Sequence, residues 1–218
     1  MRGASAMKTL CIFGKASTAI EIAETAALVV PDFDVYLVIR NEEKPENDKM
    51  ICDKDLPVLV DNREGEHRFI VPFADGDGRM SCTSFALGLG LVPMTIIHPT
   101  SIVSPSATVG EGCYIAPGAI ISSNATLAPH SILNLNATFG HDAVAGEHLV
   151  VNPGAAISGN VLIGQRVLVG ANSFIAAGLS IGDDCRIDAL TYVGRDLEPN
   201  QLCTSRQMKV FARPKRDE

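Results

Sequence analysis

Hydrophobic residues recur at every sixth position through the second half of the chain. There are seventeen such positions from Ile97 to Val193, and fifteen of them are Ile, Leu or Val. Four residues after each lies a mostly small side chain, such as Ala107, Cys113 or Ala119. A helix repeats every 3.6 residues and cannot keep a period of six. A hairpin would not hold this phase without a slip over 97 residues. Hexapeptide repetition is typical of a β-helix.

This ladder predicts a left-handed parallel β-helix with three flat faces. Each six-residue unit supplies one short strand and one turn, and three units complete a coil. The aliphatic side chains point inward and stack on counterparts eighteen residues away, so that neighbouring coils bury one continuous core. We assign residues 97–197 to this domain and residues 198–218 to a C-terminal tail.

The first half of the chain alternates between strand and helix patterns. Strands are expected at Lys8–Phe13, Phe33–Ile39, Leu56–Val60, Arg68–Phe73 and Met94–Ile97. Helices are expected at Ser17–Leu28 and Ser81–Leu89, and a turn at Asp75–Gly78. Alternation at this spacing predicts a small, parallel, Rossmann-like α/β domain over residues 7–96.

Composition narrows the classes of partner. The net charge is −7 with no basic stripe, which argues against a nucleic-acid surface. Six scattered cysteines form no CxxC pair and indicate free thiols of a cytoplasmic protein. No apolar run reaches membrane-spanning length and no signal-peptide pattern opens the chain. We expect a cytoplasmic protein without membrane insertion.

The coil geometry places His141 at an outer corner of the prism. Residues eighteen apart share a corner, so Ser123 lies above His141, and Gly159 and Ala177 lie below it. These small residues leave a groove in which an extended ligand can approach the backbone. Asp142 adjoins His141, and a carboxylate there can fix the imidazole tautomer. Histidine is suited to general-base work at neutral pH, so this pair is the candidate catalytic site.

The other histidines have simpler interpretations. His67 lies in a polar run and is expected in a solvated loop, while His98 precedes Pro99 and is expected to be structural. His130 and His148 share a different corner, where surface or interface roles are expected. A metal site is the alternative there, and it needs a third ligand; we predict none.

The motifs resemble those of the bacterial sugar O- and N-acetyltransferases of the NeuD and PglD type. Ile132-Leu133-Asn134 followed by Gly140-His141-Asp142 resembles the active-site stretch of that family. Ser158-Gly159-Asn160-Val161 resembles the coil below it, and residues 98–107 resemble the entry into the first coil. Members combine a small α/β nucleotide-sugar domain with a left-handed β-helix, so the resemblance covers nearly the whole chain.

The resemblance implies an acyl-CoA-dependent acyltransferase. The simplest form transfers acetyl from acetyl-CoA to an amino group of a nucleotide-linked amino sugar, in a homotrimer, with His141 as catalytic base and Asp142 as its partner. Together with the groove, it assigns cofactor contacts to Gly159, Asn160, Ala171, Ala177 and Ala189. It assigns acceptor contacts to Asn134, Gly14, Lys15, Ala16, Arg40, Asn41, Ala74 and Asp75.

Two departures from the family pattern concern the acceptor. The loop after the first strand is poorer in glycine than usual, and the second strand ends in Arg40-Asn41 where an acidic residue is often found. O-acetyl transfer, or transfer to a non-nucleotide acceptor, is therefore an alternative. A non-catalytic trimeric binding or scaffold protein is the alternative from another class.

Overall fold

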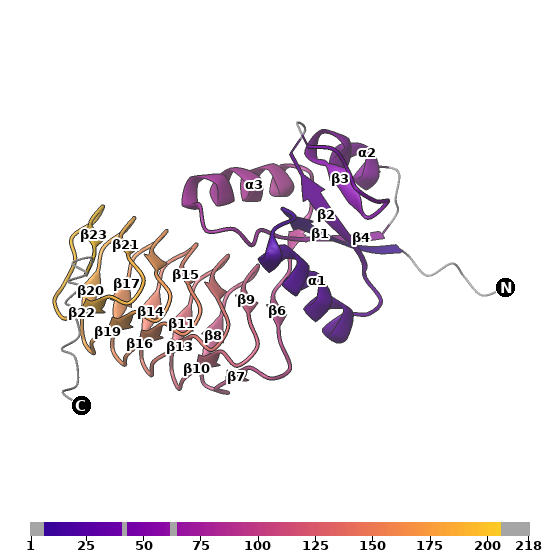
Figure 1. Ribbon diagram of the computed structural model, residues 1–218. Coiled ribbons are helices and arrows are strands. Elements are labelled where there is room, and N and C mark those ends of the chain that lie inside the picture. Colours follow the sequence, from indigo (N-terminus) through magenta and orange to yellow (C-terminus); the bar gives the residue numbers. More distant parts are fainter. Residues whose placement is uncertain (1–6, 41–42, 62–64, 206–218) are drawn as a thin grey trace, which may run out of the picture.

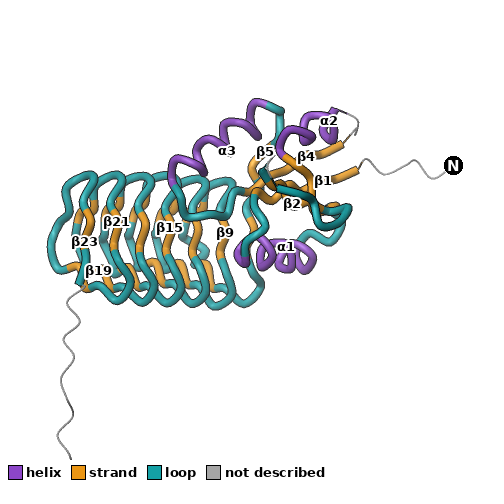
Figure 2. The backbone as a smooth tube through the Cα atoms, turned by 45° about the horizontal axis from the view of Figure 1, so that its top comes forward, coloured by secondary structure: helices purple, strands orange, loops and turns teal. Residues whose placement is uncertain are grey.

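The computed structural model describes residues 7–40, 43–61 and 65–205 (Figure 1). An N-terminal α/β part sits at one end of a long, three-sided coil (Figure 2). Both predicted architectures, the Rossmann-like part and the left-handed parallel β-helix, are confirmed. No helix among the described residues is long and apolar enough to cross a membrane.

The N-terminal part is built on one parallel sheet of five strands in the order β3-β2-β1-β4-β5. The strands are β1 (Met7–Phe13), β2 (Asp34–Ile39), β3 (Met50–Cys52), β4 (Gly65–Ile70) and β5 (Val92–Pro93). The helices are α1 (Ser17–Val29), the 3-10 turn η1 (Asp53–Asp55), α2 (Leu56–Asp61) and α3 (Gly76–Gly88). Strand order reverses between β1 and β4, as in other doubly wound α/β folds.

Two local predictions in this part are wrong, and one strand was missed. Residues 56–60 form helix α2 instead of a strand, because η1 leads directly into them and Pro57 is well tolerated in a first helical turn. The edge of the sheet is instead β3, which was not predicted. The turn expected at Asp75–Gly78 opens helix α3, since the Asp75 side chain accepts a hydrogen bond from Gly78 N and caps the helix.

The β-helix has three faces of stacked two-residue strands. The first face holds β6 (Ile96–Ile97), β9 (Tyr114–Ile115), β12 (Ile132–Leu133), β15 (Val150–Val151), β18 (Leu168–Val169), β21 (Arg186–Ile187) and β23 (Leu202–Cys203). The second face holds β7 (Ile102–Val103), β10 (Ile120–Ile121), β13 (Thr138–Phe139), β16 (Ala156–Ile157), β19 (Phe174–Ile175) and β22 (Tyr192–Val193). The third face holds β8 (Thr108–Val109), β11 (Thr126–Leu127), β14 (Val144–Ala145), β17 (Leu162–Ile163) and β20 (Ser180–Ile181).

The observed pairing follows the predicted eighteen-residue register. Leu133 pairs with Val151, and Val151 pairs with Val169. Every sixth residue from Ile115 to Val193 is buried in one continuous core, together with small side chains such as Ala119. The tail expected from residue 198 still contributes to the coil, because β23 pairs with β21 and Cys203 packs against the same core.

A second period of six explains the turns. Every sixth residue from Gly112 to Leu190 has a positive φ, between 53° and 74°. Glycine, asparagine, aspartate and histidine accept this left-handed conformation more readily than other residues. These four residue types occupy most of the positions with a positive φ, including Asp142, His130 and His148. The left-handed backbone is therefore one reason why these residues stand there.

The two parts are joined by buried contacts on α1 and α3. Helix α1 packs against the first face, where the buried Tyr114 hydroxyl donates a hydrogen bond to Glu21 Oε1 at 2.7 Å. Helix α3 lies along the edge between the third and first faces. There Arg79, only 1% exposed, donates from Nη1 to the backbone oxygen of His148 at 3.2 Å.

Candidate active site

His141 and Asp142 lie on the edge between the second and third faces, which we call the second edge. His141 Nδ1 lies 2.8 Å from Asp142 Oδ2, and both side chains are about half exposed. Asn124, one coil earlier, donates from Nδ2 to Asp142 Oδ1 at 3.1 Å. A carboxylate can only accept hydrogen bonds, so Nδ1 carries the proton and Nε2 is left as the basic nitrogen.

The charge of Asp142 is well supported. The hydrogen bond from His141, and then the one from Asn124, lowers the pKa of the Asp142 carboxyl below its ordinary value. Asp142 therefore stays ionised at neutral pH and keeps the imidazole in one tautomer. Because Asp142 also has a φ of 57°, the turn presents its carboxylate beside the ring of its neighbour.

Gly159 lies directly under the imidazole ring. A Cβ atom at this position would come closer than 3.0 Å to Cε1, Nε2 and Cδ2 of His141. The coils are joined at this point by a hydrogen bond from Asn160 N to the backbone oxygen of His141 at 2.9 Å. The ring can therefore occupy its position only because residue 159 has no side chain.

The predicted cofactor residues fall on two edges. Gly159, Asn160 and Ala177 continue the second edge below His141, as Gly178 N donates to the backbone oxygen of Gly159. Ala171 and Ala189 lie on the edge between the first and second faces, which we call the first edge. Within one chain the whole second face separates the two groups.

Asn134 also lies near the first edge. Its Nδ2 donates to Oδ1 of Asn152, eighteen residues further along the chain, at 3.3 Å. Asn134 is thus separated from His141 of the same chain by the width of the second face.

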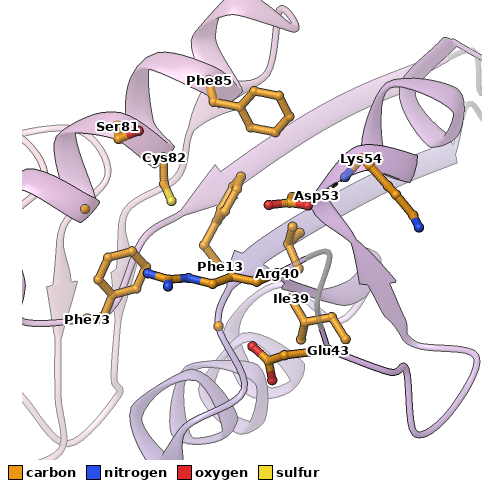
Figure 3. A pocket seen from close by; sticks show the side chains of 13 residues that line it. Phe13, Ile39, Arg40, Glu43, Asp53, Lys54, Phe73, Ser81, Cys82 and Phe85 are labelled. Atoms are coloured by element: carbon orange, nitrogen blue, oxygen red, sulfur yellow. Dashed lines mark hydrogen bonds between the residues drawn. The ribbon is translucent and has the colours of Figure 1, made fainter.

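A cavity of about 630 Å³ opens in the N-terminal part at the carboxyl ends of β1 and β2 (Figure 3). Its walls come from both strands, from η1 and from one side of α3. The lining residues are Phe13, Gly14, Val38, Ile39, Arg40, Glu43, Asp53, Lys54, Phe73, Gly78, Ser81, Cys82 and Phe85. This is the edge at which doubly wound α/β domains bind their ligands.

Of the predicted acceptor residues that the structure describes, Gly14 and Arg40 line this cavity and the others do not. Lys15 forms ion pairs with Glu43 at 2.9 Å and Glu46 at 3.3 Å, which raise the pKa of its amine. Asp75 caps α3.

Two further predicted acceptor residues lie next to helices α1 and α3. Ala16 precedes α1 as its N-cap, and Ala74 is exposed just before α3. Asn41 lies outside the described residues.

Several lining residues were missed at the sequence level. Gly78, Ser81, Cys82 and Phe85 recur at three- to four-residue spacing, which places them on one side of α3 and is a signal that the sequence does contain. Asp53 had no such signal, because the strand that positions it was not predicted.

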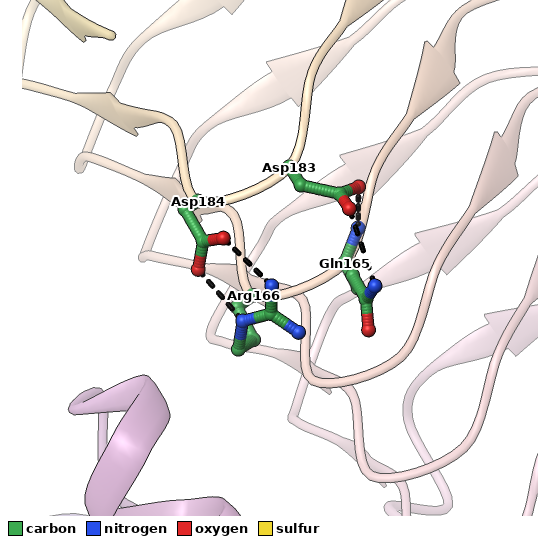
Figure 4. Close-up of polar contacts among 4 residues, drawn as sticks. All are labelled: Gln165, Arg166, Asp183 and Asp184. Atoms are coloured by element: carbon green, nitrogen blue, oxygen red, sulfur yellow. Dashed lines mark hydrogen bonds and ion pairs between the residues drawn. The ribbon is translucent and has the colours of Figure 1, made fainter. Parts of the chain in front are cut away.

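The edge between the third and first faces, which we call the third edge, carries a different polar set. The rings of His130 and His148 stack with centroids 5.0 Å apart. Farther along, Arg166 makes two hydrogen bonds to Asp184, at 2.7 and 2.6 Å, and Gln165 bonds to Asp183 (Figure 4). In the described part of the chain, no group of three or more His, Cys, Asp or Glu side chains could hold a metal ion.

The comparisons with known proteins agree with this architecture. The family described as the hexapeptide repeat of succinyl-transferase matches residues 160–195. No curated protein matches by sequence. Perosamine N-acetyltransferase from Caulobacter crescentus is 27% identical, with a TM-score of 0.82 over 91% of this chain and 95% of that one.

Two other solved structures share the fold at lower identity. The acetyltransferase domain of PglB from Neisseria gonorrhoeae is 22% identical, with a TM-score of 0.78 over 89% of this chain and 95% of that one. WeeI from Acinetobacter baumannii is 15% identical, with a TM-score of 0.83 over 90% and 96%.

The fold, the repeat and these similarities support an acyltransferase with hexapeptide repeats. The chain is similar over nearly its whole length to the perosamine N-acetyltransferase, and it shares its fold with the PglB acetyltransferase domain and with WeeI.

Proposed function

We propose that the protein transfers an acetyl group from acetyl-CoA to the amino group of a nucleotide-linked amino sugar. The observation that carries this proposal is the hydrogen-bonded pair of His141 and Asp142 at a solenoid edge, with Gly159 bare beneath the ring. The perosamine N-acetyltransferase supports it, since that enzyme has been crystallised with CoA and GDP-perosamine. Variants of it with a histidine replaced by asparagine or alanine have been crystallised with the same two ligands.

His141 acts as the general base in this proposal. The acceptor nitrogen attacks the thioester carbonyl, a C–N bond forms, and Nε2 of His141 takes the proton that the nitrogen loses. The tetrahedral intermediate then expels the CoA thiolate as the C–S bond breaks, and the proton passes to that sulfur. Asp142 holds the ring and stabilises the imidazolium formed in between.

The developing oxyanion needs a hydrogen-bond donor. The N–H of Gly159 takes no part in the backbone hydrogen bonds that join the described coils, whereas its neighbour Asn160 donates to His141 O. Gly159 N–H is therefore available beside the imidazole, and we assign it this role.

A homotrimer completes the acetyl-CoA site in this proposal. The second face exposes large apolar side chains that include Ile102, Phe174 (44% exposed) and Tyr192 (67% exposed), with the last two rings stacked. Such an exposed apolar surface is typical of a subunit interface. Packing three copies through this surface would bring the first edge of one chain, with Ala171 and Ala189, toward the second edge of another.

The acceptor binds in the cavity of the N-terminal part. A volume of about 630 Å³ falls in the usual range for small-molecule sites, about 300–1,000 Å³. Phe13, Phe73 and Phe85 offer aromatic surface to a nucleobase, and Arg40 offers positive charge to a diphosphate. We place the reaction in the cytoplasm, in keeping with six cysteines that form no disulfide among the described residues.

A ligand screen tests the proposal. Calorimetry with acetyl-CoA and thermal-shift assays with GDP-, UDP- and dTDP-linked amino sugars should identify one donor and one acceptor. Mass spectrometry of the product then distinguishes an amide from an ester, because an acceptor acetylated on a hydroxyl would indicate O-transfer. A protein that binds no acyl-CoA would instead be a scaffold, contrary to the proposal.

A further inference from the structure

Arg40 and Asp53 occupy equivalent places at the ends of neighbouring strands. Strands β2 and β3 pair in parallel, with Ile39 opposite Cys52. The next residue on each strand is Arg40 and Asp53, respectively, so both lie at the carboxyl edge of the sheet. Both line the same cavity (Figure 3).

The charges of Arg40 and Asp53 both act on the thiol of Cys82, in opposite directions. Burial raises the pKa of Cys82, while the charge of Arg40 lowers it and the charge of Asp53 raises it. Cys82 lies on α3, across the cavity from β2 and η1. The electrostatic effect of both charges therefore extends across the cavity.

Asp53 keeps one carboxylate oxygen for a ligand. Its Oδ1 accepts a hydrogen bond from Lys54 N at 2.8 Å, while Oδ2 makes no hydrogen bond or ion pair within the described residues. The other acidic residue of the cavity wall, Glu43, is already paired with Lys15. Asp53, unlike Glu43, forms no ion pair within the described residues, so its Oδ2 can accept hydrogen bonds from a bound molecule.

Doubly wound α/β domains commonly use an acidic residue near the end of the second strand to bind ribose hydroxyls. Here Arg40 stands at that end, and a guanidinium has donors only, so it cannot accept a hydrogen bond from a hydroxyl. We propose that Asp53, one strand further out, supplies this carboxylate and binds the ribose diol of the acceptor nucleotide. This inference rests on the proposed function.

The test is nucleotide binding by the whole protein, measured by calorimetry with GDP, UDP and their 2′-deoxy and 3′-deoxy analogues. Wild-type protein should bind the better ribonucleotide about 10-fold or more tightly than its deoxy forms. Asp53→Ala should weaken ribonucleotide binding about 10–100-fold and bring the ribo-to-deoxy ratio close to one. Asp53→Asn keeps an acceptor for Lys54 N and should show the same loss of discrimination, which separates it from misfolding.

Asp55→Ala is the matched control, because Asp55 lies in the same turn but does not line the cavity. It should bind like wild type. A ratio near one in the wild type, or an Asp53 effect that depends on the base and not on the hydroxyls, overturns the inference. Acetyl transfer measured in parallel keeps the two claims apart: transfer without ribose discrimination refutes only this inference, and discrimination without transfer refutes only the proposed function.

Discussion

The imidazole of His141 rests on the backbone of Gly159, eighteen residues further along the chain. The parallel stacking of the coils puts these residues in one column, and the lack of a side chain at 159 makes room for the ring. The histidine that we propose as general base is thereby supported from below by the coil and from the side by Asp142.

Gly159→Ala should displace the ring without disturbing the backbone. The φ of Gly159 lies outside the left-handed region, so alanine is tolerated there, but its methyl group overlaps the imidazole. Because misplacement of a catalytic group by about 1 Å can cost about 100-fold, we expect a fall in kcat of that order with an unchanged melting temperature. Gly88→Ala, whose methyl group meets no atom within 4 Å, is the control and should retain full activity. An active Gly159→Ala enzyme would mean that His141 does not act from this position.

Asp142→Asn should remove the charge while keeping the turn. Asparagine accepts the left-handed conformation of residue 142, so the coil should remain intact. Without the carboxylate, the Nδ1 tautomer of His141 is no longer enforced and the imidazolium is less stabilised, so kcat should fall about 10–100-fold. Steady-state kinetics with saturating acetyl-CoA measure this fall in kcat. A rate equal to wild type would mean that the carboxylate does not contribute to catalysis and serves only the turn.

Phe174→Asp should prevent assembly through the second face. Phe174 stacks on Tyr192 with ring centroids 6.0 Å apart on the exposed apolar surface, and a buried, unpaired carboxylate there is strongly unfavourable. Light scattering after gel filtration should find a trimer for wild type and a monomer for the variant, which should also lose acetyl transfer. Leu28→Asp, on an α1 residue that is 65% exposed, is the control and should remain trimeric. A trimeric, active Phe174→Asp protein would place the interface elsewhere.

The buried histidine His148 should make the fold sensitive to mild acid. Burial, followed by the charges of Arg79, His130 and Arg166, lowers the pKa of His148 from 6.5 to about 4. Between these two values the unfolded chain binds a proton that the folded chain does not. The free energy of unfolding therefore decreases as the pH falls through this window, by about 2 kcal/mol from this residue between pH 7 and pH 5.

Urea unfolding at both pH values measures this effect. Wild type should lose more stability between pH 7 and pH 5 than His148→Asn, because asparagine does not titrate and accepts the φ of 61° at this position. An equal loss in the two proteins would assign the acid sensitivity to other groups.

The β-helix was predictable because one physical constraint repeats along the chain. A narrow core admits an aliphatic residue and a small residue in each unit, so the ladder from Ile97 to Val193 contains both the fold and its register. That register alone placed His141 above Gly159.

The N-terminal part was less predictable because its short elements depend on tertiary contacts. The strand β3 has only three residues, Met50–Cys52, and gains its identity from pairing with β2. Without β3, neither η1 nor the position of Asp53 could be inferred. The burial of Arg79, which is 1% exposed, was not predicted either. It is explained only by the position of α3, which brings Arg79 against the backbone oxygen of His148.

The central claim is tested most directly by the release of CoA thiol from acetyl-CoA in the presence of GDP- and UDP-linked amino sugars, for wild type and for His141→Asn. Wild type should release thiol only when the true acceptor is present. The variant should bind acetyl-CoA as wild type does and react at least about 100-fold more slowly, the usual contribution of a general base. Acceptor-dependent release by His141→Asn at the wild-type rate would contradict the account.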